Sequence, residues 1–270
     1  MVTLVLPQML GVGAAVRRAG SVMERNAAAL KSAYWVVMIS GVVEPLLYLF
    51  SIGVGVGRLI GDITLPGSGA VIGYAAFVAP AMLAASAMTG ALSETTFNFF
   101  AKMKFVKLYD GILATPVRPT ELAFGELGWA MARGSIYSAT FLLVMVVMGL
   151  TTVPRALLAF PAAILVGFAF GGLGMALSTY MRSWQDFDLM GSAQFAVFLF
   201  SGTFVPAEAY PSVLRWLVEL TPLYRSVHLI RAIAVDTVGW MQLVDVGYLV
   251  AVTVLGLTVA GRRVGRLLCN

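Results

Sequence analysis

The chain has 270 residues, of which 60% are hydrophobic and only 11% are charged, and its mean hydropathy is +0.90. A water-soluble domain normally carries about a quarter of its residues as charged side chains, so this composition excludes that class and predicts a membrane protein. The formal net charge of +5 does not indicate nucleic-acid binding, because the basic residues lie beside apolar stretches, where they contact lipid headgroups and set orientation.

Residues 1–32 form a basic segment that is distinct from the apolar chain after it. Apolar side chains recur near helical spacing within Met9–Lys31, and Arg17, Arg18 and Arg25 stand beside them. This pattern predicts an amphipathic cytoplasmic helix that lies in the membrane surface. Two roles remain open for it, an anchor that sets orientation and a contact with a partner.

The remainder, residues 33–270, is expected to form one all-α polytopic membrane domain. Its apolar stretches reach about 17 to 25 residues, the length that a helix needs to cross roughly 30 Å of hydrocarbon. Six spans are expected, at Ala33–Gly57, Val71–Leu92, Ala123–Gly149, Ala156–Leu177, Leu189–Val205 and Asp245–Ala260. Glycines four residues apart, at Gly167 and Gly171 for example, indicate close helix contacts.

The distribution of basic residues predicts that both termini lie in the cytoplasm. With that orientation the inner segments carry twelve Lys and Arg residues: Arg17, Arg18, Arg25, Lys31, Lys102, Lys104, Lys107, Arg118, Arg182, Arg262, Arg263 and Arg266. The outer segments carry five: Arg58, Arg155, Arg215, Arg225 and Arg231. An excess of Lys and Arg on the cytoplasmic side is the rule for short loops of membrane proteins.

Two ionisable residues, Glu44 and Arg133, fall inside predicted spans. Both spans begin at the cytoplasmic side, and both residues lie about ten residues into their spans, so at about 1.5 Å per residue they reach similar depth. A charge at mid-membrane costs about 2.5 kcal/mol or more unless it is partnered. We therefore expect Glu44 and Arg133 to pair. In the alternative, Arg133 reaches the interface or pairs with Glu126, and Glu44 faces a water-filled cavity.

The first inner loop is expected to carry a short helix between proline-bounded turns. Three phenylalanines, Phe97, Phe99 and Phe100, precede three lysines, Lys102, Lys104 and Lys107. Asp110-Gly111 can start or break a turn, and Thr115-Pro116 and Arg118-Pro119 prevent the helix from continuing. Aromatic and basic groups on such a helix suit a socket on a soluble partner. A solvated loop that merely obeys the positive-inside rule is the alternative.

A second unusual segment follows the fifth span. Gly202, Pro206 and Pro211 end that span, and two helical patterns of about ten to fifteen residues, too short to cross, meet at Thr221-Pro222. Non-helical backbone is tolerated inside a membrane only where protein or water satisfies it. We therefore expect a re-entrant helical hairpin near the outer leaflet, which includes His228 and Arg231.

Enzymatic chemistry has little support in the sequence. The chain contains no GxxxxGK[ST] phosphate loop. Its one histidine, His228, allows no histidine cluster for metal binding or a catalytic triad, and its one cysteine, Cys269, cannot form an internal disulfide. No catalytic, metal-binding or cofactor-binding residue is predicted.

With these features in place, the full length of the chain resembles the permease subunits of ABC-2 type exporters, in the branch of NodJ-like lipooligosaccharide exporters and daunorubicin-resistance exporters. The motifs that carry the resemblance are VEPLLYLFSIGVGVG at Val43–Gly57, KLYDGILATPVRP at Lys107–Pro119, SWQDFD at Ser183–Asp188, FSGTFVPAEAYP at Phe200–Pro211 and PLYRSVHLIRAI at Pro222–Ile233.

The resemblance implies a subunit that dimerises with a second copy or a homologue, in a bacterial cytoplasmic membrane, and docks on separate ATPase subunits that bind ATP and Mg. It implies that the first inner loop enters the ATPase and that residues 180–186 make a smaller contact. The residues assigned to this coupling are Lys107, Asp110, Thr115, Pro116, Arg118, Arg182 and Asp186. Drugs, lipids or glycoconjugates would move outward by alternating access; the alternative is a nucleotide-independent channel or secondary carrier.

Overall fold

The computed structural model describes residues 2–30, 43, 46–47, 49–64, 69, 71–235 and 238–268, and this part of the chain is almost entirely helical. The helices up to the first inner loop are α1 (Val2–Leu30), the π-helical η1 (Leu49–Val56), α3 (Gly57–Ile60), α4 (Tyr74–Ser93), the π-helical η2 (Glu94–Asn98) and η3 (Ala101–Phe105), and α5 (Leu108–Leu113). The later helices are α6 (Pro119–Val147), α7 (Val153–Ser178), α8 (Gln185–Leu199), the 3₁₀ turn η4 (Ala207–Ala209), α9 (Ser212–Leu220), α10 (Pro222–Val235) and α11 (Met241–Leu268). Strands β1 (Asp62–Thr64) and β2 (Val71–Gly73) form an antiparallel hairpin.

Four helices in the described part of the chain are long and apolar enough to cross a membrane: Tyr74–Phe105, Pro119–Val147, Val153–Ser178 and Met241–Arg263. They coincide with the predicted second, third, fourth and sixth spans, so the prediction of a polytopic helical membrane protein is confirmed. The second is longer than predicted, because the helix continues past Leu92 through η2 and η3 to Phe105. The predicted first span lies largely outside the described residues.

The predicted fifth span is wrong in its extent. Helix α8 begins at Gln185 and ends at Leu199 rather than Val205, because Phe200 leaves the helical conformation and Gly202 takes a positive φ of 72°. Its 15 residues reach about 22 Å at about 1.5 Å per residue, less than the roughly 30 Å of a hydrocarbon core. Six spans are therefore not established.

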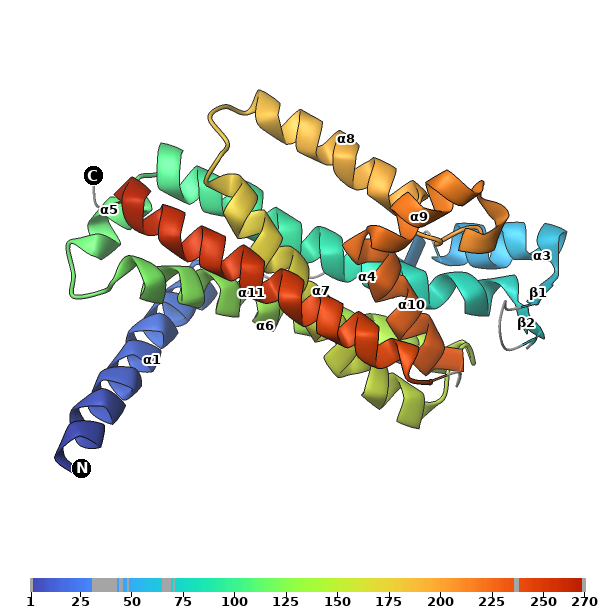
Figure 1. The fold of residues 1–270 in the computed structure, drawn as a ribbon, viewed down its shortest axis with the longest axis horizontal. Coiled ribbons are helices and arrows are strands. Elements are labelled where there is room, and N and C mark those ends of the chain that lie inside the picture. The colour runs from blue at the N-terminus through green and yellow to red at the C-terminus, as the bar shows by residue number, and fades with distance from the viewer. Residues whose placement is uncertain are drawn as a thin grey trace.

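The spanning helices lie side by side along the long axis of the molecule (Figure 1). Helix α7 packs against α4, α6 and α11, and α4 is the most buried of the four spans. Helix α5 and the C-terminal end of α11 lie at one end, and the β1–β2 hairpin lies at the other (Figure 1). The described loops thus lie at the two ends of the bundle, as alternating spans require.

Glycines allow the closest approach between spans. A Cβ on Gly256 of α11 would lie 2.5 Å from the carbonyl carbon of Gly172 in α7, a backbone contact that leaves no room for a side chain. Gly167 and Gly171 face Met131 and Leu127 of α6, so the predicted close helix contact at that glycine pair is confirmed.

Helices α9 and α10 form two arms joined at Thr221, as the proline pattern predicts. Helix α10 packs against α4, α7 and α11 and buries Leu223, Val227 and Ile230. At the turn, the Tyr248 hydroxyl of α11 donates to the carbonyl of Leu220 at 2.6 Å. The turn therefore lies beside α11 and not beyond its end, and the re-entry of this hairpin into the membrane stays a prediction.

Candidate functional site

The loop between the second and third spans, predicted to be the first inner loop, carries the predicted short helix, α5. Lys107 precedes it with a positive φ of 48°, which turns the chain out of the second span. The Thr115 hydroxyl then donates to the carbonyl of Ile112 at 2.5 Å and closes the turn before Pro116. In this segment Lys107, Asp110, Thr115, Pro116 and Arg118 are all exposed.

One aromatic side chain anchors this exposed loop. Tyr109 of α5 is fully buried, and its ring lies 5.1 Å from the ring of Phe99. Burial and the nearby Glu126 carboxylate raise the pKa of the Tyr109 phenol well above its ordinary value, so it stays neutral and can donate a hydrogen bond. A polar outer face held by one buried tyrosine can contact a partner without losing its own packing.

Residues 180–186, predicted to be the second inner segment, are held in place by a carboxylate. Asp186, in the first turn of α8, accepts hydrogen bonds from the backbone N–H groups of Arg182 at 2.7 Å and Ser183 at 3.1 Å. These bonds lower the pKa of Asp186 below its ordinary value, because they stabilise the ionised form. The Arg182 side chain is exposed and is available to a partner.

A cluster of aromatic rings joins the two inner segments. Trp184 lies 4.8 Å from Phe105, 5.0 Å from Phe97 and 5.6 Å from both Phe100 and Phe187, between ring centroids. The sequence predicts the phenylalanines before α5 as part of a partner-binding surface but gives no sign of this cluster. Because Trp184 contacts rings from both segments, we expect a displacement of one segment to displace the other.

The beginning of α6 is joined to α1 by ion pairs that the sequence did not reveal. The Arg18 guanidinium donates to both carboxylate oxygens of Glu121, at 2.7 and 2.6 Å. Five residues further along, Glu126 accepts from Lys102 and Arg25. Helix α1 is therefore docked on α6 through charged groups as well as through its apolar side. Whether its apolar side also lies in a membrane surface stays a prediction.

Arg133 pairs with Glu94, and not with Glu126, in the described part of the chain. Its Nη1 lies 2.5 Å from Oε1 of Glu94, at the start of η2. The predicted partner, Glu44, lies outside the described residues. Glu94 was not predicted as a partner because it lies beyond Leu92, the predicted end of the second span, whereas the structure extends that span to Phe105.

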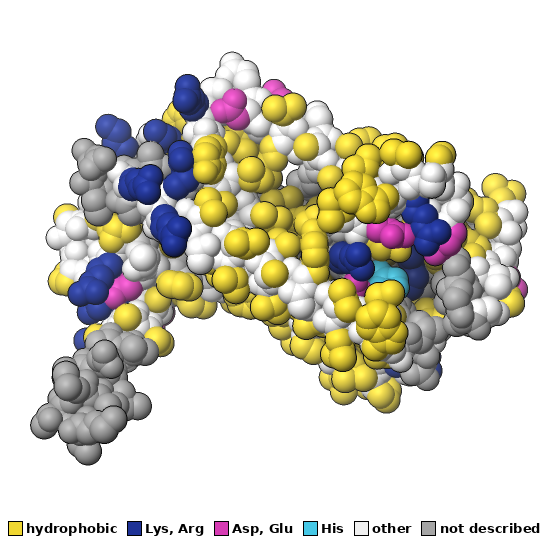
Figure 2. All heavy atoms as spheres, viewed as in Figure 1, with side chains coloured by type: hydrophobic (Ala, Val, Ile, Leu, Met, Phe, Trp, Pro, Cys, Tyr) yellow, Lys and Arg dark blue, Asp and Glu magenta, His cyan; other side chains and the backbone are white. Residues whose placement is uncertain are grey.

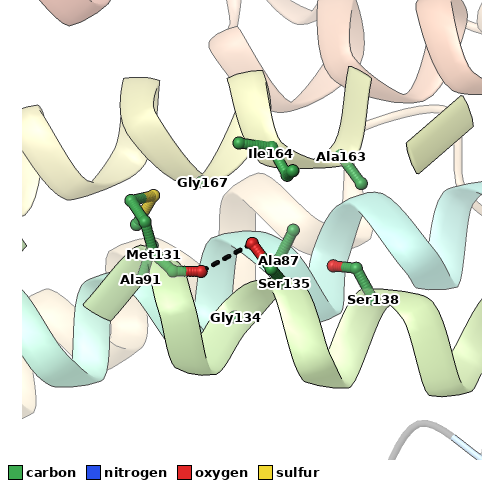
Figure 3. Close-up of a pocket in the computed structure, with 9 residues that line it drawn as sticks. All are labelled: Ala87, Ala91, Met131, Gly134, Ser135, Ser138, Ala163, Ile164 and Gly167. Carbon is green, nitrogen blue, oxygen red and sulfur yellow. Dashed lines mark hydrogen bonds between the residues drawn. The ribbon is translucent and has the colours of Figure 1, made fainter. Parts of the chain in front are cut away.

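A small pocket lies between α4, α6 and α7, close to this ion pair in sequence (Figure 3). Its lining is mostly small: Ala87, Ala91, Met131, Gly134, Ser135, Ser138, Ala163, Ile164 and Gly167. The Ser135 hydroxyl is already occupied, since it donates to the carbonyl of Met131 at 2.7 Å. The pocket is therefore lined by uncharged side chains, with Ser138 as its second serine.

At the other end of the bundle, Arg231 connects three elements. Its Nε donates to the carbonyl of Phe77 in α4 at 3.0 Å, and its Nη2 donates to the carbonyl of Gly202, after α8, at 2.9 Å. The guanidinium also lies 3.8 Å from the centre of the Phe77 ring. Arg231 of α10 thus fixes the end of α8 against α4. Pro206, Pro211 and Pro222 stand at the starts of η4, α9 and α10.

His228 takes part in a polar cluster on the face shown in Figure 2. Its Nδ1 lies 2.5 Å from Oδ2 of Asp245 in α11, and Nη1 of Arg225 lies 3.2 Å from the other carboxylate oxygen. Asp245 is fully buried. Through these two contacts the cluster joins α10 to α11. In the part of the chain that the structure describes, no group of three histidine, cysteine or acidic residues is arranged to hold a metal ion.

Comparison with known proteins matches residues 20–235 to the family model described as ABC-2 type transporter. The chain is 32% identical over 214 residues to nodulation protein J of Rhizobium leguminosarum bv. trifolii, which covers 79% of each chain. It is 31% identical over 220 residues to nodulation protein J of Sinorhizobium fredii, with 81% of this chain and 82% of the relative covered. The nodulation protein J of Rhizobium meliloti is 30% identical over 214 residues, 79% of each chain.

Proposed function

The chain belongs to the ABC-2 type transporter family, and we propose that it is the permease of an exporter that moves an amphipathic cargo outward across the bacterial cytoplasmic membrane. Membership in the family makes it the membrane subunit of an ABC transporter. The apolar exposed surface of the spans, visible as the broad yellow area of Figure 2, suits lipids, drugs or lipid-linked sugars. No single residue of the described part selects among these cargoes.

The observation that carries the proposal is the exposed α5 loop. Its polar residues face outward while Tyr109 fixes it to the bundle, and Trp184 connects it to the segment that Asp186 orders. A permease that relies on another subunit for ATP needs a stiff polar surface through which force can enter. We propose that the ATPase subunit grips this surface, through Asp110, Thr115 and Pro116 for the larger contact and through Arg182 for the smaller one.

The proposed cycle is alternating access at an interface between two permease subunits. Helix α8 buries none of its side chains in the single chain, and it contacts α4 through one hydrogen bond, from Gln194 to Thr89 at 3.0 Å. An exposed helix of this kind suits a cavity or an interface with the second subunit. ATP binding would shift the equilibrium between inward and outward states only through different contacts in the two states.

The test uses the chain purified with its ATPase subunit and reconstituted in lipid vesicles. Replacement of Asp110 and Thr115 by alanine should abolish ATP-dependent export of a fluorescent lipid probe and release the ATPase during purification. Replacement of the exposed Val238, which is far from the loop in the chain, serves as the matched control and should change neither. Export of the probe by the permease alone, without nucleotide, would favour the channel or carrier alternative and refute the proposal.

A further inference from the structure

Glu126 is the point at which three inner elements meet. Its side chain is 7% exposed, and its Oε2 accepts from Nζ of Lys102 in η3 at 2.6 Å. Its Oε1 lies 3.3 Å from Nη2 of Arg25 in α1. The carboxylate itself belongs to α6, so one side chain joins the N-terminal helix, the extension of the second span and the start of the third span.

Asn26 strengthens the same junction. Its Oδ1 accepts from Arg25 at 2.5 Å and from Lys102 at 3.3 Å, and the residue is 5% exposed. Helix α5 reaches this junction through Tyr109, which is fully buried and packs on Phe99, two residues before the η3 helix that carries Lys102.

The junction holds more donors than acceptors. Three of the four buried side-chain atoms without a hydrogen-bond partner in the described residues lie at this junction: Nε of Arg25, Nδ2 of Asn26 and the Tyr109 hydroxyl. All three can donate, and two cations already share the Glu126 carboxylate. A buried charge or donor without a partner is costly, and the loss of Glu126 would leave two partly buried cations without their shared counter-ion.

We propose that Glu126 is a positioning residue that holds α5 in a fixed relation to α1 and α6, so that force applied to α5 displaces all three elements together. This role rests on the proposed function, in which α5 receives the force of an ATPase. Lys102 lies in a π-helical turn, a conformation that is frequent at functional sites. The ion pair between Lys102 and Glu126 therefore fixes the position of η3 relative to α6.

The geometric part of the proposal is tested on the permease alone in lipid nanodiscs. Spin labels are placed at Arg17→Cys in α1 and Gly111→Cys in α5, two exposed positions, after Cys269→Ser removes the only natural cysteine. Glu126→Gln should roughly double the width of the distance distribution between the labels, because the elements then move separately. Glu24→Gln, an exposed carboxylate of α1, should leave the width unchanged.

Two further variants make the result specific. The double exchange Lys102→Glu with Glu126→Lys should bring the distribution back toward the wild-type width, which a general loss of folding would not do. If Glu126→Gln fails to fold, Lys102→Met is used instead, and it should broaden the distribution less, since Arg25 still reaches the carboxylate. A wild-type width in the folded variant, or no recovery in the double exchange, overturns the proposal.

The functional part is read in the complex with the ATPase. Glu126→Gln should keep the ATPase bound and hydrolysing ATP while export per ATP falls severalfold, because force no longer passes from α5. Unchanged export per ATP overturns the proposal. If no ATPase binds even the wild-type chain, the proposed function fails, whereas the spin-label distances still decide whether Glu126 holds the three elements together.

Discussion

Arg133 of α6 and Glu94 of η2 form an ion pair in the interior of the bundle, with Nη1 and Oε1 2.5 Å apart and with 17% and 7% of the two side chains exposed. A cation within a membrane-spanning helix is tolerated only where a partner or water compensates it. The pair also joins α6 to the first turn of the π-helical part of the second span.

Removal of either partner should destabilise the protein more than removal of both. Arg133→Met or Glu94→Gln leaves one buried charge uncompensated, which costs about 3–5 kcal/mol in buried pairs. The double variant buries no net charge and should recover most of that loss. The melting temperature in nanodiscs gives the comparison. If the double variant melts no higher than the less stable of the two single variants, other groups compensate each charge.

Helix α1 should be displaced from α6 by a single methyl group. A Cβ on Gly125 would lie 2.7 Å from Cβ of Val22 and 2.8 Å from the carbonyl oxygen of Ala19, and overpacking of this kind costs about 1–3 kcal/mol. Gly125→Ala should therefore increase the rate of tryptic cleavage at Arg17 and Arg25.

The matched control for this variant is a second glycine of α6. Gly134 has no atom within 4 Å of a built Cβ, so Gly134→Ala should leave the cleavage rate unchanged while improving helix propensity by up to about 1 kcal/mol. Equal cleavage rates for the two variants would mean that α1 is not held at Gly125.

The contact between α7 and α11 should be equally sensitive. A Cβ on Gly256 would lie 2.5 Å from the backbone carbon of Gly172, and backbone cannot move away as a side chain can. Gly256→Ala should lower the melting temperature and reduce export. Gly247→Ala, on the exposed side of α11 with nothing within 4 Å, should do neither. A neutral Gly256→Ala would show that α11 can shift along α7 without cost.

Long apolar helices could be predicted from the sequence because hydropathy depends only on composition. Helices α6, α7 and α11 lie where their apolar stretches place them, and the break at Thr221 follows from Pro222. The length of the second span could not be predicted in this way. Its last turns contain Glu94 and Lys102, two charged residues that hydropathy assigns to a loop. Their partners on α6, which allow them to lie in the helix, cannot be recognised from the sequence.

The candidate site shows the same division. The short helix α5 and its exposed residues follow from glycine and proline signals in the loop, and they could be predicted. The cluster around Trp184 depends on two segments separated by two spans, and spacing along the chain does not reveal such a contact. The cation partners of Glu121 and Glu126 could not be predicted either, because a position near the start of a helix does not show which neighbouring helix supplies the cation.

Trp184 should be needed for transport but not for assembly with the ATPase. Trp184→Ala removes the ring that contacts both inner segments, and edge and stacked aromatic contacts each contribute about 0.5–1.5 kcal/mol. Export should fall while the ATPase still binds α5. Trp240→Ala, at an exposed position outside the cluster, is the control. Loss of ATPase binding in Trp184→Ala would indicate that the ring shapes the docking surface itself.

Asp186 should order the second inner segment equally well across the neutral pH range. Hydrogen bonds from the Arg182 and Ser183 backbone lower its pKa in the folded protein, so its contribution is complete above the ordinary pKa and is lost only as the pH falls through the lowered value. Asp186→Asn keeps an acceptor but loses the charge that favours these bonds and the start of α8. Trypsin should therefore cleave after Arg182 faster in the variant, and by the same factor at about pH 6.5 and about pH 8.5, since Asp186 stays ionised throughout. A factor that changes between these two values would mean that another group, titrating near neutrality, controls the order of this segment.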